Sequence, residues 1–161
     1  MVNRNDESRI SFTKLVFSGR GIFVNENKNL IVSINDEDHL IVTSQTNGNR
    51  MNETYERLIR ATDQLNHSFA FQQHQRLGYL NCSPSNIGTG LQVTVRMKLI
   101  HAEKLNQMVD FARKLDIRLE NTNENQIVNL SNAIQLGRTE FHIIRSMWDG
   151  IQQIIEEDLR E

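Results

Sequence analysis

Apolar residues in the first third of the chain fall in short runs that favour β-strand. Residues 12–23 form one such stretch, interrupted by two glycines. Two further runs, residues 30–34 and 40–43, are rich in Ile, Val and Leu and flank the acidic turn 35–39. Short apolar runs separated by turn residues are typical of paired strands. The pattern therefore predicts a hairpin of two well-buried strands over residues 30–43.

From residue 53 the apolar positions change to the spacing of a helix. One face carries apolar side chains and the opposite face carries charges, which is the pattern of an amphipathic helix. Asn49 or Asn52 can cap its amino terminus, because an Asn side chain accepts hydrogen bonds from N–H groups of the first turn. The same spacing recurs over residues 105–115 and predicts a second helix. The two apolar faces consist of Tyr55, Leu58, Ile59, Thr62 and Leu65, and of Leu105, Met108, Val109, Ala112 and Leu115.

Between and after these helices the pattern returns to strands and loops. Residues 93–99 alternate strictly between apolar and polar side chains, which predicts a strand with one buried face. Residues 82–90 contain the single proline of the chain and two glycines, and therefore predict a loop. Residues 117–119 and 127–130 flank an Asn-rich loop and predict another antiparallel pair.

The last apolar stripe is the widest. It follows Gly137 and extends over four turns, with Thr139 placed to cap the helix. We expect the whole stripe, including Trp148, to belong to the core. Its residues are Phe141, Ile144, Met147, Trp148, Ile151, Ile154 and Ile155. Elements in this order predict an α+β fold, a mostly antiparallel sheet flanked by helices, in a single domain at residues 10–161 that follows a polar tail at residues 1–9.

The composition limits the classes of partner. The 161 residues carry 18 Lys and Arg against 20 Asp and Glu, a net charge of -2, so no strong overall field attracts nucleic acid or anionic lipid. Cys82 is the single cysteine, which excludes an internal disulfide and favours a reducing compartment. No stretch is long and apolar enough for a membrane span, and the amino terminus lacks the apolar centre of a signal peptide. We therefore expect a cytoplasmic protein that binds neither nucleic acid nor membrane.

Taken singly, the local motifs leave the chemistry open. The turn 36–39, with three carboxylates and a histidine, can bind a cation, although adjacent carboxylates in a turn are more often only solvated. Cys82 can act as a nucleophile near a cation, or pack as a small apolar residue at a strand end. The segment 88–90 has two glycines but lacks the lysine of a phosphate-binding P-loop. None of the five histidines has zinc-site spacing, so we expect no metal site.

Taken in order, five segments resemble those of one family. The sequence resembles the carboxy-terminal catalytic domain of the phosphagen (ATP:guanido) kinases, of the arginine and creatine kinase type, over nearly its whole length. The resemblance implies the glutamine-synthetase-like fold of that domain and the transfer of a phosphoryl group from MgATP to a guanidinium nitrogen. The segments are 19–28 (Gly-Arg-Gly-Ile-Phe-Val-Asn-Glu-Asn-Lys), 35–40 (Asn-Asp-Glu-Asp-His-Leu), 76–78 (Arg-Leu-Gly), 84–91 (Pro-Ser-Asn-Ile-Gly-Thr-Gly-Leu) and 136–140 (Leu-Gly-Arg-Thr-Glu), followed by Asp149 and Gly150.

The resemblance also assigns site residues, and most of the catalytic ones differ here. Glu37 matches the glutamate that contacts the guanidinium, Arg76 matches the arginine of Arg-Leu-Gly, and Arg118 matches the first residue of a later motif. The family's helical amino-terminal domain and an upstream strand with an Arg-x-Arg element have no counterpart, so we expect a truncated and degenerate member. The replaced positions are Ile41, Gln92 and Asn121 for arginines, Ser83 for the reactive cysteine, and Arg96 for the histidine near the adenine.

The replaced arginines lead us to expect a non-catalytic protein. A hydrogen bond to an ionised group contributes about 1.5–3 kcal/mol, and each lost contact to a developing oxyanion costs ~10²–10³ in rate. We therefore expect a binding or structural subunit, without cofactor, whose protein partner is a cytoskeletal or axonemal assembly or a full-length kinase homologue. The alternative is an ATP:guanidino phosphotransferase that uses MgATP and that a partner chain completes. A third alternative is a nucleotide or guanidine sensor without turnover.

Overall fold

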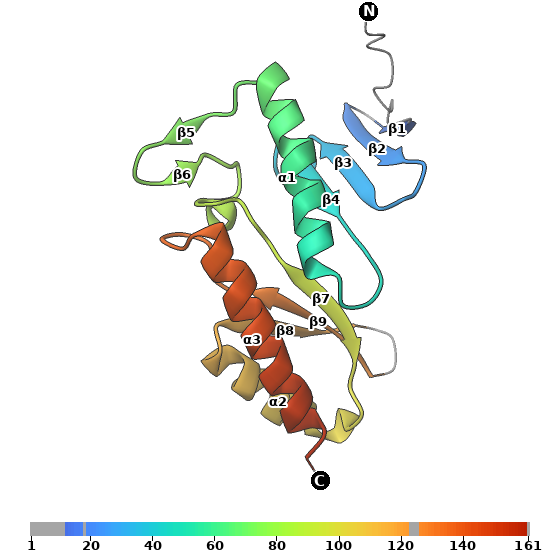
Figure 1. Cartoon of the computed structure of the whole chain (residues 1–161), viewed down its shortest axis with the longest axis vertical. Coiled ribbons are helices and arrows are strands. Elements are labelled where there is room, and N and C mark those ends of the chain that lie inside the picture. The colour runs from blue at the N-terminus through green and yellow to red at the C-terminus, as the bar shows by residue number, and fades with distance from the viewer. Residues whose placement is uncertain (1–11, 18, 123–125, 161) are drawn as a thin grey trace, which may run out of the picture. The chain divides into compact units, whose positions relative to one another are not determined.

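The computed structural model of the chain describes residues 12–17, 19–122 and 126–160. The polar tail expected at residues 1–9 lies outside the described residues. The chain divides into two compact units, Met1–Phe71 and Gln72–Glu161 (Figure 1). Strands and helices follow one another as the sequence predicts, and the strand pairs are antiparallel, so the α+β class is confirmed.

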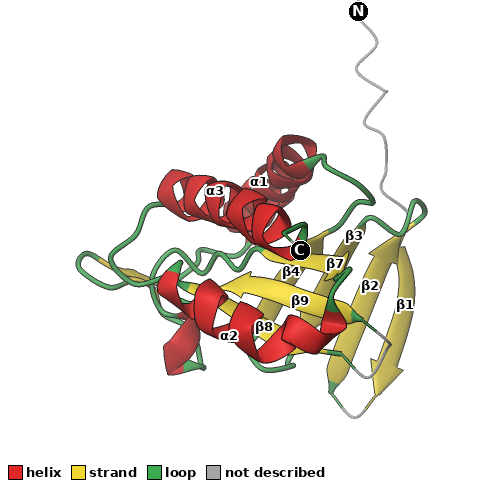
Figure 2. Ribbon diagram, turned by 90° about the horizontal axis from the view of Figure 1, so that it is seen from below, coloured by secondary structure: helices red, strands yellow, loops and turns green. Residues whose placement is uncertain are grey.

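The first unit contains a four-stranded antiparallel meander (Figure 2). Its strands are β1 (Phe12–Phe17), β2 (Arg20–Asn25), β3 (Leu30–Ile34) and β4 (Leu40–Ser44), paired in chain order. The hairpin predicted over residues 30–43 is therefore present. The expectation that both its strands are well buried is wrong for β4, which has no buried residue. Helix α1 is the one helix among the described residues of this unit.

Helix α1 (Met51–Ser68) presents the predicted apolar face to the sheet, but none of its residues is fully buried. Neither Asn49 nor Asn52 caps it, so that expectation is wrong. The helix begins after Arg50, whose carbonyl oxygen accepts the N–H of Thr54 at 3.1 Å and the hydroxyl of Thr54 at 2.9 Å. A cap at Asn49 or Asn52 would need the helix to start one residue earlier or two residues later.

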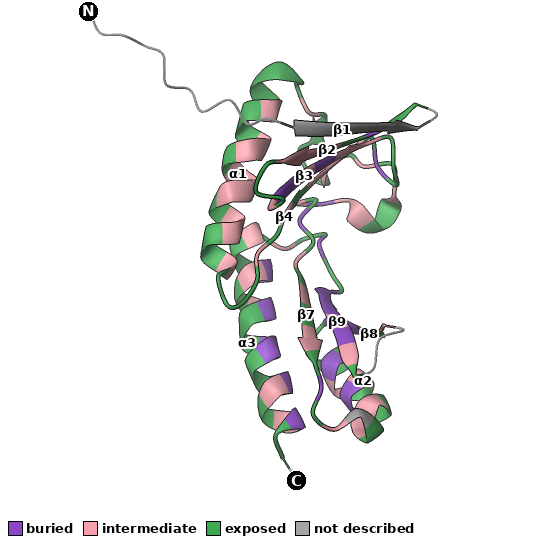
Figure 3. Ribbon diagram, turned by 90° about the vertical axis from the view of Figure 1, so that its right-hand side faces the viewer, coloured by how far each residue is buried: buried purple, intermediate pink, exposed green. Residues whose placement is uncertain are grey.

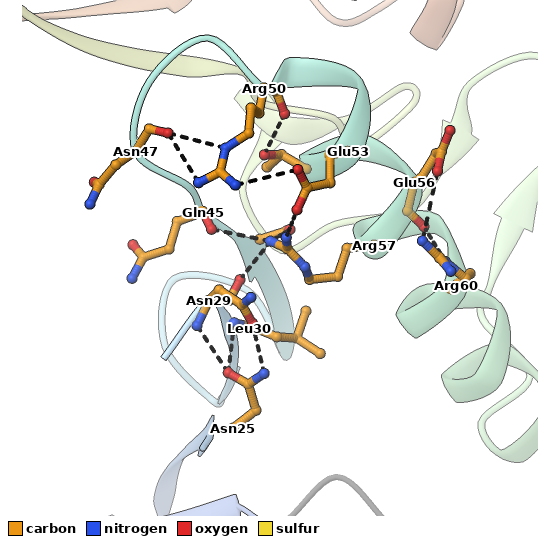
Figure 4. Close-up of polar contacts among 12 residues, drawn as sticks. Asn25, Asn29, Leu30, Gln45, Asn47, Arg50, Glu53, Glu56, Arg57 and Arg60 are labelled. Carbon is orange, nitrogen blue, oxygen red and sulfur yellow. Dashed lines mark hydrogen bonds and ion pairs between the residues drawn. The ribbon is translucent and has the colours of Figure 1, made fainter. Parts of the chain in front are cut away.

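Polar contacts of Arg57 join α1 to the sheet (Figure 4). The Arg57 side chain is only 20% exposed, and its Nη1 donates to the carbonyl oxygens of Asn29 at 3.4 Å and Gln45 at 3.1 Å and to Ser44 Oγ at 3.2 Å. Its Nη2 donates to Glu53 Oε1 at 3.1 Å. Since α1 buries no apolar side chain fully, this partly buried guanidinium contributes much of the specific attachment between helix and sheet.

The second unit contains a three-stranded antiparallel sheet in the order β7 (Thr94–Lys98), β9 (Ile127–Asn132), β8 (Ile117–Asn121). The predicted strand at 93–99 and the predicted pair at 117–130 are both confirmed, with β9 in the centre. A short hairpin, β5 (Gln73–His74) and β6 (Gly78–Tyr79), precedes this sheet. The predicted loop at 82–90 contains one turn of 3₁₀-helix, η1 (Pro84–Asn86).

Two helices complete the second unit: α2 (Leu105–Lys114), which follows the 3₁₀ turn η2 (Ala102–Lys104), and α3 (Glu140–Asp158). Helix α2 buries Met108 and Ala112, two residues of its predicted face, and contacts both β8 and α3. Figure 3 shows the buried side of α3 turned toward β7 and β9. The largest fully buried side chains of this unit are Leu99, Met108, Val128, Leu130, Met147 and Ile154.

The cap of α3 is as predicted, whereas its apolar stripe is only partly so. Thr139 Oγ1 accepts the His142 N–H at 3.2 Å. Phe141 is 71% exposed and Trp148 is 38% exposed, so the expectation that Trp148 is a core residue is wrong. The apolar stripe covers more of the helix surface than the part that packs against the sheet. Helix α3 contacts the sheet through the side that carries Gly150, where a β-carbon would overlap the Ile117 side chain. The buried residues of α3 are Ile143, Met147, Gly150, Ile151, Ile154 and Asp158.

Candidate functional site

Close contacts between glycines join segments of the second unit that are separate in the sequence. Gly78 has φ +75°, and a β-carbon there would overlap the carbonyl oxygen of Gly88. That oxygen accepts the Tyr79 N–H at 2.8 Å. Gly88 has φ +126°, and its β-carbon would lie 3.0 Å from backbone atoms of Gln135 and Leu136. Three of the five family-like segments therefore meet in this unit: 76–78, 84–91 and 136–140.

Arg76 lies at the tip of the β5–β6 hairpin and is exposed. Its N–H donates to His74 Nδ1 at 3.2 Å, which closes the turn. The side chain therefore extends from a turn whose backbone is fixed by Gly78, an arrangement suited to a contact with an anionic group.

The adjoining loop carries Cys82 and Ser83. Cys82 is exposed, so its interpretation as a small packed core residue is wrong. Ser83 Oγ lies 2.7 Å from Ser85 Oγ, within hydrogen-bond distance. Backbone and amide contacts around η1 fix this loop, so Cys82 and Ser83 both project from an ordered turn.

One face of the β7–β9–β8 sheet is polar. Along β7 the residues alternate between exposed and half-buried, as predicted for residues 93–99. The apolar residues point to the face that packs against α3, so the polar ones share the opposite face. The resemblance does not assign Lys98 to a site, although the alternation alone places it on this face. The exposed side chains of the polar face are Thr94, Arg96, Lys98, Arg118 and Glu120.

The strand register places the arginines of this face in neighbouring rows. Arg96 and Glu120 are both paired with Asn129 of the central strand, and Arg118 is paired with Ser131 in the next row. Residues paired in this way point to the same face, about 10 Å apart across two strand spacings. The structure therefore brings Arg96 and Arg118 onto one surface, together with a carboxylate.

Gln92 and Asn121, two of the replaced positions, do not meet on this surface. Gln92 is exposed just before β7, between Leu91 and Val93, and continues the exposed row of that strand. Asn121 is paired with the buried Val128, so it belongs to the opposite face of the sheet from Arg118. The resemblance alone gave no indication of this separation.

In the first unit, Glu37 lies at the exposed tip of the β3–β4 turn. Asn35 adopts φ +53°, and its side-chain amide donates to the Gly19 carbonyl oxygen at 3.0 Å, so this turn is tied to the β1–β2 turn. The Asp36 N–H donates to the Asp38 carbonyl oxygen at 3.2 Å, and the Asp38 side chain is buried. The carboxylate of Glu37 therefore projects from a fixed turn into solvent.

Ile41, the third replaced arginine position, lies in an uncharged row of the same sheet. It pairs with Ser33 of β3, which pairs with Ile22 of β2, so the three side chains share one face. Ile41 is half-buried and Ile22 is exposed. Where the resemblance expects a phosphate-binding arginine, this row presents two isoleucines and a serine, and no charge.

Metal ligation and shifted titration give no further candidates in the described part of the chain. No three His, Cys, Asp or Glu side chains are grouped there to hold a metal ion, the turn 36–39 included. The pKa of Glu103 lies below its ordinary value because of a backbone hydrogen bond of its own and the adjacent His101. Among the described helices, none combines the length and apolarity needed to cross a membrane.

Comparison with known proteins identifies the family. Residues 3–160 match a family model described as "ATP:guanido phosphotransferase, C-terminal catalytic domain". The chain belongs to this family. The match extends over both compact units, and it confirms the resemblance stated from the five segments.

Relatives and solved structures agree with the family. The chain is 35% identical over 149 residues to arginine kinase of Pachygrapsus marmoratus and 36% identical over 148 residues to a probable arginine kinase of Caenorhabditis elegans, with 86% of this chain covered in both. It spans 41% and 40% of those two proteins, about two fifths of their length.

Among solved structures, the chain is similar to the duplicated taurocyamine kinase of Schistosoma mansoni with bound transition state analog components. The TM-score is 0.81 at 34% identity, over 87% of this chain and 20% of that one. Lombricine kinase gives a TM-score of 0.78 at 29% identity, over 86% of this chain and 41% of that one. The expected guanido kinase catalytic-domain fold is therefore confirmed.

Proposed function

We propose that this chain is a non-catalytic member of the family, which acts as a binding or structural subunit of a larger assembly. The observation that carries the proposal is the uncharged row of Ile22, Ser33 and Ile41, with an aliphatic side chain at position 41, where the resemblance puts a cation. An isoleucine offers a triphosphate no charge-assisted hydrogen bond. Gln92 and Asn121 add two more uncharged positions, and they lie on different surfaces of the second unit.

The cost of these replacements for phosphoryl transfer is large. Catalysis of this reaction depends on positioning and on positive charge around the transferred group. Each lost contact to a developing oxyanion costs ~10²–10³ in rate, and effects of residues that act together are not additive. Three such losses remove most of the stabilisation that the transition state needs, even with a discount for non-additivity.

Exposed aromatic side chains support a protein partner for the proposed subunit. Phe141 and Trp148 lie on one side of α3, seven residues apart, which is two turns of the helix. Large exposed apolar groups that cluster are typical of interaction surfaces. The proposed partner is a cytoskeletal or axonemal assembly or a full-length kinase homologue, and the proposed location is the cytoplasm in association with that assembly.

A second candidate function is ATP:guanidino phosphotransfer completed by a partner chain, with MgATP as substrate. Arg96, Lys98 and Arg118 favour it, because three cations on one exposed sheet face attract phosphate groups. Glu37 is the glutamate that the resemblance assigns to the guanidinium contact, and Arg76 is the arginine of the Arg-Leu-Gly motif. The same cations also favour a sensor that binds nucleotide without turnover.

Titration calorimetry separates these candidates. The full chain is titrated with MgATP, alone and with arginine or creatine, next to the double variant Arg96→Gln, Arg118→Gln and the control Lys114→Gln, which removes an exposed cation of α2. The proposal predicts no saturable heat with any of these ligands. Saturable binding that the double variant loses and the control retains would contradict it and support nucleotide binding by the polar face.

A further inference from the structure

The loop between β4 and α1 contains the single Asn-Gly pair of the sequence, Asn47 and Gly48. Both residues are exposed. Gly48 adopts φ +76°, and a β-carbon built on it would have no atom within 4 Å, so the backbone around its nitrogen is sterically open. An open Asn-Gly pair is chemically labile, because the glycine nitrogen can attack the asparagine side chain.

The hydrogen bonds of this loop leave both reacting groups available. Attack needs a backbone nitrogen that can lose its proton and an amide group that can turn toward it. In the described part of the chain, no hydrogen bond engages the Gly48 N–H or the Asn47 side-chain amide. The contacts of Asn47 are made by its main-chain carbonyl oxygen instead.

That carbonyl oxygen is held by a guanidinium group. Arg50 Nε and Nη2 each lie 3.4 Å from the Asn47 oxygen, as Figure 4 shows. The oxygen belongs to the same peptide group as the Gly48 nitrogen, so the negative charge left by deprotonation is shared between the two atoms. Arg50 Nη1 lies 3.6 Å from Glu53 Oε2, an ion pair that keeps the guanidinium in this orientation.

We propose that Asn47 and Gly48 form a self-modification site, at which Arg50 promotes deamidation of Asn47. The Gly48 nitrogen gives its proton to solvent and forms a bond to Asn47 Cγ. The bond from Cγ to Nδ2 then breaks, Nδ2 takes a proton from solvent, and ammonia leaves. The resulting cyclic imide is then opened by water, with aspartate or isoaspartate as product. Arg50 stabilises the charge on the Asn47 oxygen during the first step, as donors stabilise other developing oxyanions.

The product alters the start of α1. Either form of it adds a carboxylate three residues before Arg50, close to the amino terminus of the helix, where negative charge is favourable. The isoaspartate form also adds one carbon to the main chain between β4 and α1. The modification therefore changes the connection between β4 and α1, next to the point where Arg57 attaches the helix to the sheet.

Two residues of the same chain serve as internal controls. Asn49 is exposed like Asn47, but the nitrogen that would attack it, that of Arg50, donates to the Gly48 carbonyl oxygen at 3.1 Å. Asp149 and Gly150 form an Asp-Gly pair, which can form isoaspartate by the same ring closure. These two residues lie within α3, however, and Gly150 is buried. Selective conversion of Asn47 is therefore the expectation, without conversion at Asn49 and without isoaspartate at position 149.

The test is an incubation of the folded full chain at mildly alkaline pH, followed by peptide mapping with mass spectrometry and chromatographic separation of aspartate from isoaspartate. Asn47 should convert at a rate close to that in the urea-unfolded chain. Arg50→Gln should slow the conversion about two- to fivefold, the range of an exposed charge contact. Arg50→Lys should restore part of it, and the control Arg60→Gln, an exposed arginine of α1, should leave it unchanged.

The following results would contradict the modification site or the role of Arg50. An unmodified Asn47 after prolonged incubation, or equal conversion of Asn47 and Asn49, contradicts the modification site. An unchanged rate in Arg50→Gln, in a variant whose circular dichroism matches that of the original chain, contradicts the role of Arg50. Asn47→Gln, which cannot form the five-membered ring, should abolish the product, and a product that persists in this variant contradicts the assigned position.

Discussion

Gly78 lies against the carbonyl oxygen of Gly88 so closely that no other residue fits at position 78. The backbone of Gly78 is in the left-handed region at φ +75°, and the next residue, Tyr79, donates its N–H to the same oxygen at 2.8 Å. The contact joins the hairpin that carries Arg76 to the loop that carries Cys82 and Ser83. Because Gly78 has no side chain, the two family-like segments 76–78 and 84–91 can approach closely enough for this hydrogen bond.

Gly78→Ala should destabilise the second unit more than Gly137→Ala. Both glycines have a positive φ, +75° and +76°, but a β-carbon at position 137 has no atom within 4 Å. Backbone strain alone costs about 1–3 kcal/mol, and the alanine at position 78 adds the overlap with the Gly88 oxygen. Urea unfolding of both variants measures the difference. Equal losses of unfolding free energy would show that the glycine contact contributes nothing beyond backbone strain.

Asp158 should be the carboxylate on which the second unit depends most. It is 3% exposed, and its two oxygens accept the N–H groups of Ile100 at 2.8 Å and His101 at 3.2 Å. Asp158→Ala leaves two N–H groups without their acceptor, so the free energy of unfolding should fall by about 2–3 kcal/mol. Asp110→Ala, which removes an exposed partner of Arg113, should cost less than ~1 kcal/mol. Similar effects of the two substitutions in thermal melts would contradict this assignment.

Arg57 should stabilise the packing of α1 on the β1–β4 sheet. Arg57→Met keeps much of the apolar stem but removes four polar contacts to the sheet and the helix. Amide hydrogen exchange in α1 should become faster, because no fully buried apolar residue of this helix compensates. Arg60→Met, which breaks an exposed ion pair with Glu56 at 3.7 Å, is the matched control and should leave exchange unchanged. Unaltered exchange in Arg57→Met would mean that the half-buried apolar face alone holds the helix.

Cys82 should react with a thiol reagent such as a disulfide dye while the chain remains folded. The thiol is exposed on the ordered loop after β6, so access does not require unfolding. The native chain should therefore be modified to completion, at a rate similar to that of the urea-unfolded chain. A reaction that proceeds only in denaturant would contradict the exposed position.

The local elements of the fold could be predicted from the sequence because their signals are local. The alternation of residues 93–99 corresponds to β7, and Thr139 caps α3 as expected. The order β7-β9-β8 could not be predicted, because α2 and β8 separate β7 from β9 in the chain and local patterns do not reveal which distant strands pair. The prediction that Trp148 is a core residue was wrong for a related reason. The pattern shows which residues are apolar, but not which side of a wide apolar stripe packs against the sheet.

In the candidate site, too, the sequence predicted the positions of residues on turns but not those that depend on the pairing of distant strands. Glu37 and Arg76 lie on turns, where the acidic run and the glycine-containing motif suggest them. The face on which a strand residue lies depends on register, and a sequence does not provide the register of distant strands. Asn121 therefore points away from the surface that Arg118 shares with Arg96. The contact between Gly78 and Gly88 was equally hidden, since a glycine in a motif does not reveal what lies against it.

The most direct test of the central claim is a coupled assay for ADP release by the full chain, supplied with MgATP and arginine or creatine, next to Glu37→Gln. The account predicts that the two proteins give the same background signal, because Ile41, Gln92 and Asn121 lack the cations that the resemblance puts at those three positions. Phosphoryl transfer above background by the original chain, lost in Glu37→Gln, would contradict the claim and show that the chain is a catalyst.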